Sequence, residues 1–294
     1  MAFFRRRTPT PHNDWYHEAS DDARREYDAF GPWVYEVAQE QDLPPRFRDS
    51  FGPWGGSELV LKVPIDVERR NARPGQDLYR QVLEIRGDSL RGLSLVEGRV
   101  VETSVSVGSV QALTVFQALL LGTFSATTAD GEFSFTYNTV SSPLVDRFVD
   151  LLRGKLAPET LAPRSAPPLV VKNFFFQHLV REHQRRSRGT RVVHCDEPGL
   201  RVRDDRGRSR KGLGLLVLET ASELLILDAG TPWKRPGRPA YGSRCLYIPR
   251  KSWKAVTLEA TTLNLSLAHL VLSFPLLNDR TSLTQALALS PPRP

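Results

Sequence analysis

The sequence has few residues that carry redox or metal chemistry. Its 294 residues include two cysteines, one methionine and six histidines. Cys195 and Cys245 are far apart and neither belongs to a C-x-x-C pair, so a disulfide-stapled secreted fold is not expected. His194 and Cys195 with Cys245 could form part of a zinc site only if further ligands joined them. Two structural thiols are the simpler reading, and no metal is predicted.

Motifs for cofactors and for nucleophilic catalysis are also missing. There is no P-loop, no G-x-G-x-x-G after a strand and no nucleophile elbow around the serine of GGSEL. Paired carboxylates such as Asp21-Asp22 and Asp204-Asp205 lie in polar stretches where solvated turns are the ordinary role. We therefore expect no cofactor and no catalytic residue. An enzyme of unrecognised type stays a third reading, because carboxylate sites need no motif.

Long apolar runs are absent. The first residues, MAFFRRRTPTPHNDW, have no apolar region after the arginines, which argues against a signal peptide. The window of lowest charge, residues 260–278, contains polar residues and alternates as a strand does, which argues against a membrane span. We expect a cytoplasmic protein.

Positive charge is concentrated in one region. The net charge is +7, from 40 Lys and Arg against 33 Asp and Glu. Between His178 and Leu258 there are 18 cations and 8 acids, so the remainder has 22 cations and 25 acids. Such a region suits nucleic acid, an anionic membrane or an acidic partner. Only seven of the cations are lysine, so an arginine-rich solvated face set by genome composition is the alternative.

The best binding candidate lies in this region, where no acid occurs between Asp228 and Glu259. Cations that hold phosphates and aromatics that stack on bases suit single-stranded nucleic acid, and the same composition suits an anionic lipid surface. Trp253 is excluded, because it matches Val110 in the repeat described below and is expected in the core. The predicted binding residues are Trp233, Lys234, Arg235, Arg238, Tyr241, Arg244, Arg250 and Lys251, with Arg185 and Arg186 from the preceding helix.

The chain is expected to be mainly β and to have four parts. Residues 1–58 read as an N-terminal arm, and residues 59–155 as short strands followed by a helix that starts at Ser142-Pro143. Residues 156–189 contain a Pro-rich linker and an amphipathic basic helix with Val171, Phe174, Phe175 and Leu179 on its apolar face. Residues 190–290 form a second β-rich block with a final helix.

The two β-rich blocks read as two copies of one fold. The segment GSVQALTV of residues 108–115 matches KSWKAVTL of residues 251–258, with Ser, Ala and Thr identical. Strands precede each segment, and a strand that runs directly into a helix ends each block. An amphipathic helix that closes the open end of a bent antiparallel sheet gives this order a physical reason.

This order of elements resembles the bacterial pleckstrin-homology-like (PH-like) domains, here in tandem. The residues that carry the resemblance are 107–115 with 133–152, and 247–258 with 269–287. The resemblance implies two antiparallel, PH-like β-sheet or barrel domains, each closed by a C-terminal helix, and a role in binding and assembly. The first copy lacks the cationic first hairpin of phosphoinositide-binding relatives, since Glu84, Arg86, Asp88 and Arg91 are of mixed sign.

The arm contains a doubled phrase, DAFGPW at residues 28–33 and DSFGPW at residues 49–54. Proline disfavours a helical conformation in the preceding glycine, so each phrase is an extended or turned peptide that presents two large rings. We expect Phe30, Trp33, Phe51 and Trp54 to anchor the arm to the body of the protein. The alternative is a free arm whose phrases dock into another protein.

These observations favour a non-catalytic binding or scaffold module that contacts a protein partner or an anionic surface through the second domain. The alternative is a nucleic-acid-binding protein that uses the basic aromatic surface of residues 181–254. Partner identity and oligomeric state do not follow from the sequence.

Overall fold

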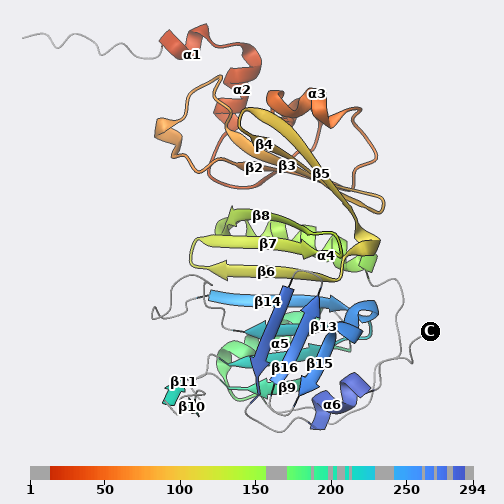
Figure 1. Ribbon diagram of the computed structural model, residues 1–294. Coiled ribbons are helices and arrows are strands. Elements are labelled where there is room, and N and C mark those ends of the chain that lie inside the picture. The colour runs from red at the N-terminus through yellow and green to blue at the C-terminus, as the bar shows by residue number, and fades with distance from the viewer. Residues whose placement is uncertain are drawn as a thin grey trace, which may run out of the picture. The chain divides into compact units, whose positions relative to one another are not determined.

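The computed structural model describes residues 14–156, 171–186, 189–197, 201–203, 209–211, 214–228, 242–259, 262–267, 270–276 and 281–288. Within these ranges the chain is mainly β, with antiparallel sheets and a few helices (Figure 1). This confirms the mainly β class expected from the sequence. None of the sheets in the described ranges closes into a barrel.

The chain divides into two compact units. Unit 1 comprises residues 1–87 and 91–103, and unit 2 comprises residues 88–90 and 104–294. The division passes through residues 59–155, the first domain expected from the sequence. The predicted domain boundaries therefore stay a prediction.

Unit 1 contains most of a five-stranded sheet in the order β1-β2-β3-β4-β5. Its strands are β1 (Tyr35–Glu36), β2 (Leu59–Pro64), β3 (Tyr79–Arg86), β4 (Ser89–Val96) and β5 (Arg99–Ser106). Glu97 and Gly98, with φ of 49° and 74°, form the two-residue turn between β4 and β5, as a type I′ hairpin requires. β1 pairs with β2, so the segment expected to be an arm adds a strand to the sheet.

The helical segments of unit 1 precede or interrupt its strands. They are α1 (Asp14–Glu18), α2 (Asp21–Ala29), η1 (Glu40–Asp42), η2 (Pro45–Phe47), α3 (Arg48–Phe51) and η3 (Arg69–Asn71). Ser20 caps α2, because its hydroxyl accepts a hydrogen bond from the Ala23 N–H at 3.3 Å. The core combines residues of the first 58 positions with residues of the sheet and of the connection between β2 and β3: Phe30, Val37, Leu43, Phe47, Phe51, Val60, Ala72, Leu78, Tyr79, Val82 and Leu93.

Unit 2 contains a seven-stranded sheet in the order β8-β7-β6-β14-β13-β12-β9. Its strands are β6 (Ala112–Ala118), β7 (Leu121–Thr127), β8 (Glu132–Asn138), β9 (Arg191–Asp196), β12 (Leu215–Glu219), β13 (Glu223–Asp228) and β14 (Gly242–Pro249). The central pair, β6 and β14, runs antiparallel from Gly242 opposite Ala118 to Tyr247 opposite Leu113. Strands far apart in the sequence therefore share one continuous sheet (Figure 1).

A second sheet and the helices complete unit 2. The three-stranded sheet is β15 (Val256–Glu259), β16 (Thr262–Leu267) and β17 (Leu270–Pro275), and a separate hairpin is β10 (Arg201–Arg203) with β11 (Ser209–Lys211). The helical segments are η4 (Val107–Ser109), η5 (Thr139–Ser141), α4 (Ser142–Leu156), α5 (Phe174–Arg186), η6 (Arg250–Ala255) and α6 (Thr281–Ala288). Trp253 lies in the core between the two sheets, as the repeat predicts.

The helices expected from the sequence are present, with one correction. In α4, which starts at the predicted Ser142-Pro143, Val145, Phe148 and Leu152 are buried. The apolar face predicted for this segment is wrong in part: Val171 is buried, but Phe174 is 77% exposed and Phe176 is buried instead. Asn173 caps this helix, because its side chain accepts the Phe176 N–H at 3.1 Å. No helix in the described ranges is both long and apolar enough to cross a membrane.

The same order of elements occurs twice along the chain. β2–β5 are followed by η4, the antiparallel strands β6–β8 and helix α4. β9 and β12–β14 are followed by η6, the antiparallel strands β15–β17 and helix α6. The two segments matched in the sequence, residues 108–115 and 251–258, begin in η4 and η6 and run into β6 and β15.

Candidate functional site

Half of the predicted binding residues lie outside the described residues. They are Trp233, Lys234, Arg235, Arg238 and Tyr241, in the segment 229–241. The residues that flank this segment are described: Asp228 ends β13 and Gly242 begins β14. Because Gly242 pairs with Ala118, this end of the seven-stranded sheet is also where the turn between β6 and β7 lies.

Arg244 and Arg250 have carboxylate and aromatic partners within the fold. Arg244 forms an ion pair with Asp228, and its guanidinium lies 5.4 Å from the ring of Phe274. Arg250 lies 3.6 Å from the Glu219 carboxylate and 4.5 Å from the ring of Trp253. These contacts use much of the donor capacity that a phosphate group would need.

Lys251 and Arg186 also have partners within unit 2. Lys251 donates to the Gly108 carbonyl, and burial lowers its pKa against the opposing effect of Asp88. Arg186 pairs with Asp146 at 3.1 Å and with Glu182 at 2.9 Å. Arg185 is exposed. Of the predicted binding residues that the structure describes, Arg186, Arg244 and Arg250 therefore lie beside carboxylates.

The two Phe-Gly-Pro-Trp phrases lie in unit 1, and each is held by an arginine. Phe30 and Phe51 are buried in the core cluster, as anchors would be. Arg69 donates to the carbonyl of Phe30 and, at 2.9 Å, to that of Tyr27. Arg91 donates to the carbonyls of Ser50 and Phe51, at 2.7 and 2.8 Å.

The tryptophans of the two phrases differ in exposure. Trp54 is half-buried and stacks on Phe51, with ring centroids 5.6 Å apart and planes at 29°. Trp33 is 38% exposed. The phenylalanines, rather than the tryptophans, provide most of the buried anchoring surface.

The β6–β7 turn presents an apolar patch that the sequence reading missed. Ala118 pairs with Leu121, so Leu119 and Leu120 form a two-residue turn. The exposed fractions of Leu119, Leu120 and Leu121 are 75%, 67% and 54%, and that of Val140 is 58%. Val140 adjoins the turn, because the Thr139 N–H donates to the Leu120 carbonyl at 3.1 Å. We call Leu119, Leu120, Leu121 and Val140 the leucine turn.

Leu119 has a backbone conformation that normally selects glycine. Its φ is +53°, and a two-residue hairpin with positive φ at the first turn position usually has glycine there. A non-glycine residue in the left-handed region costs roughly 1–2 kcal/mol. The available sequence signal was three consecutive leucines at a hairpin turn, where polar residues or glycine are usual.

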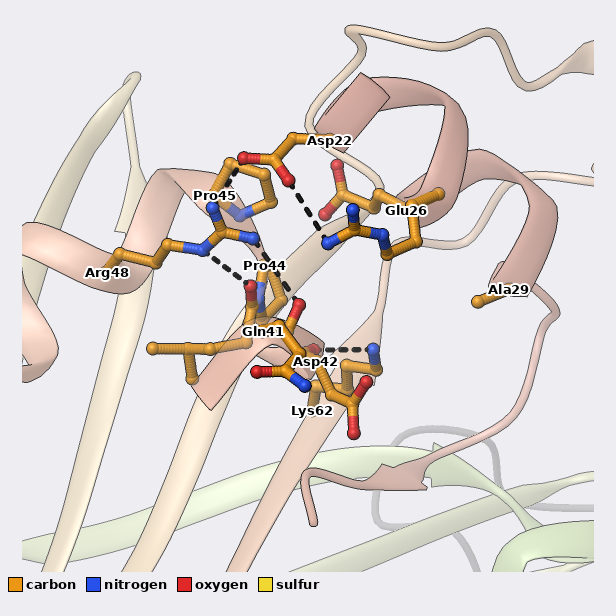
Figure 2. Close-up of a pocket in the computed structure, with 11 residues that line it drawn as sticks. Asp22, Glu26, Ala29, Gln41, Asp42, Pro44, Pro45, Arg48 and Lys62 are labelled. Atoms are coloured by element: carbon orange, nitrogen blue, oxygen red, sulfur yellow. Dashed lines mark hydrogen bonds and ion pairs between the residues drawn. The ribbon is translucent and has the colours of Figure 1, made fainter. Parts of the chain in front are cut away.

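A small cavity lies in unit 1 between α2 and the η1–α3 segment (Figure 2). Arg48 spans it: the guanidinium pairs with Asp22 at 2.6 Å and donates to the Leu43 carbonyl at 3.2 Å. Lys62 donates to the Asp42 carbonyl at 2.8 Å, and its ammonium lies 4.8 Å from the centre of the Tyr79 ring. These contacts tie the helical segments to strand β2.

The same cavity shifts the protonation of Glu26. Burial raises the pKa of Glu26 to about 7, with Lys62 acting in the opposite direction. Burial also lowers the pKa of Lys62 and raises that of Tyr79, whose hydroxyl has no hydrogen-bond partner in the described part of the chain. The volume of about 30 Å³ is enough for about two water molecules and too small for an organic substrate. The cavity can hold water and titrate a carboxylate, and it offers no substrate site.

The thiols and His194 are not assembled for zinc. Cys195, Leu216, Leu227 and Cys245 lie in one row across β9, β12, β13 and β14. Three strand spacings separate the two cysteines by about 14 Å, which is also too far for a disulfide. His194 is buried beside Asp196 at 2.9 Å. In the described ranges no group of three metal-binding side chains is found.

Comparison with known proteins gives no relative: no family model, no curated protein and no solved structure matches this chain.

Proposed function

We propose that the chain is a non-catalytic binding or scaffold module that binds a protein partner. The contact surface is the end of the seven-stranded sheet where β6 and β14 pair, with the leucine turn as its apolar centre. Gly242, which begins β14 and belongs to the second β-rich block, pairs with Ala118 beside this turn, so the proposed surface includes residues of both blocks.

The leucine turn is the observation that carries this proposal. Scattered exposed apolar side chains are ordinary on a protein surface, whereas a contiguous group often marks a contact site. Here three exposed leucines follow one another and Val140 adjoins them. Leu119 also holds a strained conformation, and strained residues cluster at functional sites.

The repeated order of elements supports a finer fold proposal, namely two PH-like domains in tandem. Each series has strands, a short 3-10 segment, three antiparallel strands and a terminal helix. Modules of this kind would serve binding and assembly, which is an inference from fold analogy.

The charge contacts favour a protein partner over nucleic acid. Arg244, Arg250 and Arg186 each lie beside a carboxylate of the same unit. A phosphate backbone would have to compete with these carboxylates. The leucine turn offers no charge to a phosphate and suits the apolar centre of a protein interface.

The experiment compares partners captured by the full chain and by variants. Leu120→Ser removes an exposed side chain from the leucine turn, and Val271→Ser removes one of similar exposure, 69%, from β17 as the matched control. We expect a stoichiometric protein, identified by mass spectrometry at high salt, to be retained by the wild-type chain and Val271→Ser. Its recovery with Leu120→Ser should fall at least tenfold.

Two outcomes would contradict the proposal. Equal capture by both variants would remove the leucine turn from the interface. Retention of nucleic acid or anionic vesicles at low salt alone, lost on changing Arg235, Arg238 and Arg244 to Ala, would favour the alternative function.

A further inference from the structure

The pairing of β6 with β14 joins the two series of elements within one chain. In the first series, β6 is the first strand after the 3-10 segment η4. In the second series, β14 is the last strand before the 3-10 segment η6. Their edges meet in antiparallel register, with Leu113 opposite Tyr247 and Val115 opposite Cys245. An edge of one series thus already serves as the docking site for an edge of the other.

The match of residues 108–115 with 251–258 sets a difference of 143 in residue number between the two series. The same difference relates β6 to β15 and β5 to β14. It carries residues 99–106 of β5 onto residues 242–249 of β14 without a gap, and residues 113–116 of β6 onto residues 256–259 of β15. It also relates Gly108 to Lys251, which are in contact through a hydrogen bond. β15 therefore corresponds to β6, and β5 corresponds to β14.

β5 and β15 are the end strands of their sheets. The sheet orders are β1-β2-β3-β4-β5 and β15-β16-β17, so within the described ranges each has one edge without a strand neighbour. An exposed strand edge presents unpaired N–H and C=O groups and is a template for pairing with another chain. The edges of β15 and β5 correspond to the edges through which β6 and β14 pair. In the described part of the chain, neither of these two edges has a strand neighbour.

The hydrogen-bonding directions of these edges also match. In a hairpin with a two-residue turn, the residues flanking the turn bond to each other, and the outward groups then occur at every second position. The turn after β6 therefore directs Leu113 and Val115 toward β14, and the pair Glu259–Thr262 directs Val256 and Leu258 away from β16. Leu113 and Val115 correspond to Val256 and Leu258 under the difference of 143. The free edge of β15 therefore presents its backbone groups at the positions that β6 uses to pair with β14.

The same phase holds for the other two strands. The turn at Glu97 and Gly98 directs the backbone groups of Val100, Glu102 and Ser104 away from β4. Their counterparts in β14 are Ser243, Cys245 and Tyr247, which lie opposite Gln117, Val115 and Leu113 of β6. The free edge of β5 thus presents its groups at the positions that β14 uses.

We propose that β15 of one molecule pairs antiparallel with β5 of a second copy of this chain. The contact is head-to-tail, because the two surfaces differ, so it builds short open oligomers unless the geometry closes a ring. Helix α6 packs beside β15, and the proposal requires that it leave the backbone edge of this strand open, as α4 does for β6, which pairs with β14.

The internal register predicts the register between molecules. Thr257 of β15 lies opposite Thr103 of β5, since Thr114 lies opposite Leu246 in the internal pair. Both threonines are exposed, and a threonine pair across strands is favourable. β15 has four residues against seven in β6, so the contact is weaker than the internal one. We expect association between about 10 µM and about 1 mM, the range of weak complexes.

Disulfide trapping tests the predicted register. In the double variant Thr103→Cys, Thr257→Cys, oxidised at about 0.5 mM, directly opposed Cβ atoms lie within disulfide reach, and a ladder of reducible oligomers should form. All variants also have Cys195→Ser and Cys245→Ser, which remove the two native free thiols, so each single variant can form dimers at most. The matched control is Ser104→Cys with Thr257→Cys, whose side chains point to opposite faces of the proposed sheet and should not form a ladder.

Sedimentation velocity on the unmodified chain gives an independent readout, in which the mean mass should rise with concentration. A monomer at every concentration together with no ladder would overturn the proposal. Equal ladders from the control variant, or a cross-link confined to single chains, would also overturn it. The leucine turn is not involved, so Leu120→Ser should leave the ladder unchanged.

Discussion

Arg91 holds Phe51 from two directions: its guanidinium donates to the Phe51 carbonyl at 2.8 Å and lies 5.6 Å from the centre of the Phe51 ring. The same side chain pairs with the buried Glu84 at 3.4 Å and with Glu102 at 2.9 Å. Arg69 holds Phe30 through its carbonyl in the other copy of the phrase. An arginine from later in the chain therefore fixes each Phe-Gly-Pro-Trp phrase.

Arg91→Ala should destabilise unit 1 by about 2–4 kcal/mol, because it removes a partner of buried Glu84 and two donors to backbone carbonyls. Urea unfolding followed by tryptophan fluorescence measures the loss. Arg91→Lys keeps the charge but loses the planar fork, so it should be intermediate. Wild-type stability in Arg91→Ala would contradict this role.

The sequence predicted local elements well, because their signals lie within a few residues. Strand β8 alternates between apolar and polar residues along its sequence, and Phe133, Phe135 and Tyr137 are its buried residues. Helix α4 starts at Ser142-Pro143, where the missing proline N–H costs nothing. The repeat match correctly placed Trp253 in the core.

Leu119→Gly should increase stability by about 0.5–1 kcal/mol and weaken partner binding. Glycine relieves the positive φ, and the 75% exposed leucine side chain contributes little buried area. Thermal unfolding and partner capture would be measured on the same preparations. Leu119→Ala is the control, since it removes the side chain but keeps the strain, and it should lose binding without the gain in stability. A stability loss in Leu119→Gly would exclude strain at this turn.

Glu26→Gln should change how stability depends on pH. The folded pKa of about 7 lies above the ordinary value of 4.5, so the contribution of Glu26 to wild-type stability falls as pH rises from about 4.5 to 7 and is then constant. The variant lacks this cost and should be more stable than wild type by roughly 1–3 kcal/mol at pH 8, with the difference vanishing near pH 4.

Urea unfolding at pH 4, 6 and 8 measures the effect, with Glu40→Gln, an exposed carboxylate, as control. The charged groups that act on Glu26 are Lys62, Asp77, Arg48 and Asp22. These groups are present in both proteins, so their own titration largely cancels in the difference between the free energies of unfolding of Glu26→Gln and wild type. If this difference is the same at all three pH values, the raised pKa of Glu26 is contradicted.

Contacts between distant residues could not be predicted, because they depend on sheet order. The sequence shows Arg244 in an acid-free stretch, yet its partner Asp228 lies across a strand pair, before segment 229–241. The pairing of β6 with β14 brings together strands separated by more than a hundred residues, and no local pattern encodes that register. Counting charges therefore missed the acidic neighbour that the fold gives Arg244.

The buried pair Arg153–Glu223 should show the coupling of a true ion pair. Arg153 of α4 donates to the Glu223 carboxylate of β13 through Nε at 3.1 Å, and its guanidinium lies 4.4 Å from the ring of Tyr247. Glu223→Leu leaves buried Arg153 with Asp150 as a charged partner and should cost about 3–5 kcal/mol.

The double variant Arg153→Met, Glu223→Leu should recover at least half of that loss, because two apolar side chains of similar volume leave no buried charge unpaired. Urea unfolding of wild type, both single variants and the double variant completes the cycle. Additive losses would show that the two charges are stabilised independently. Coupling would mean that this pair joins α4, which ends the first series of elements, to β13, which belongs to the second series. Unit 2 should then unfold in one transition.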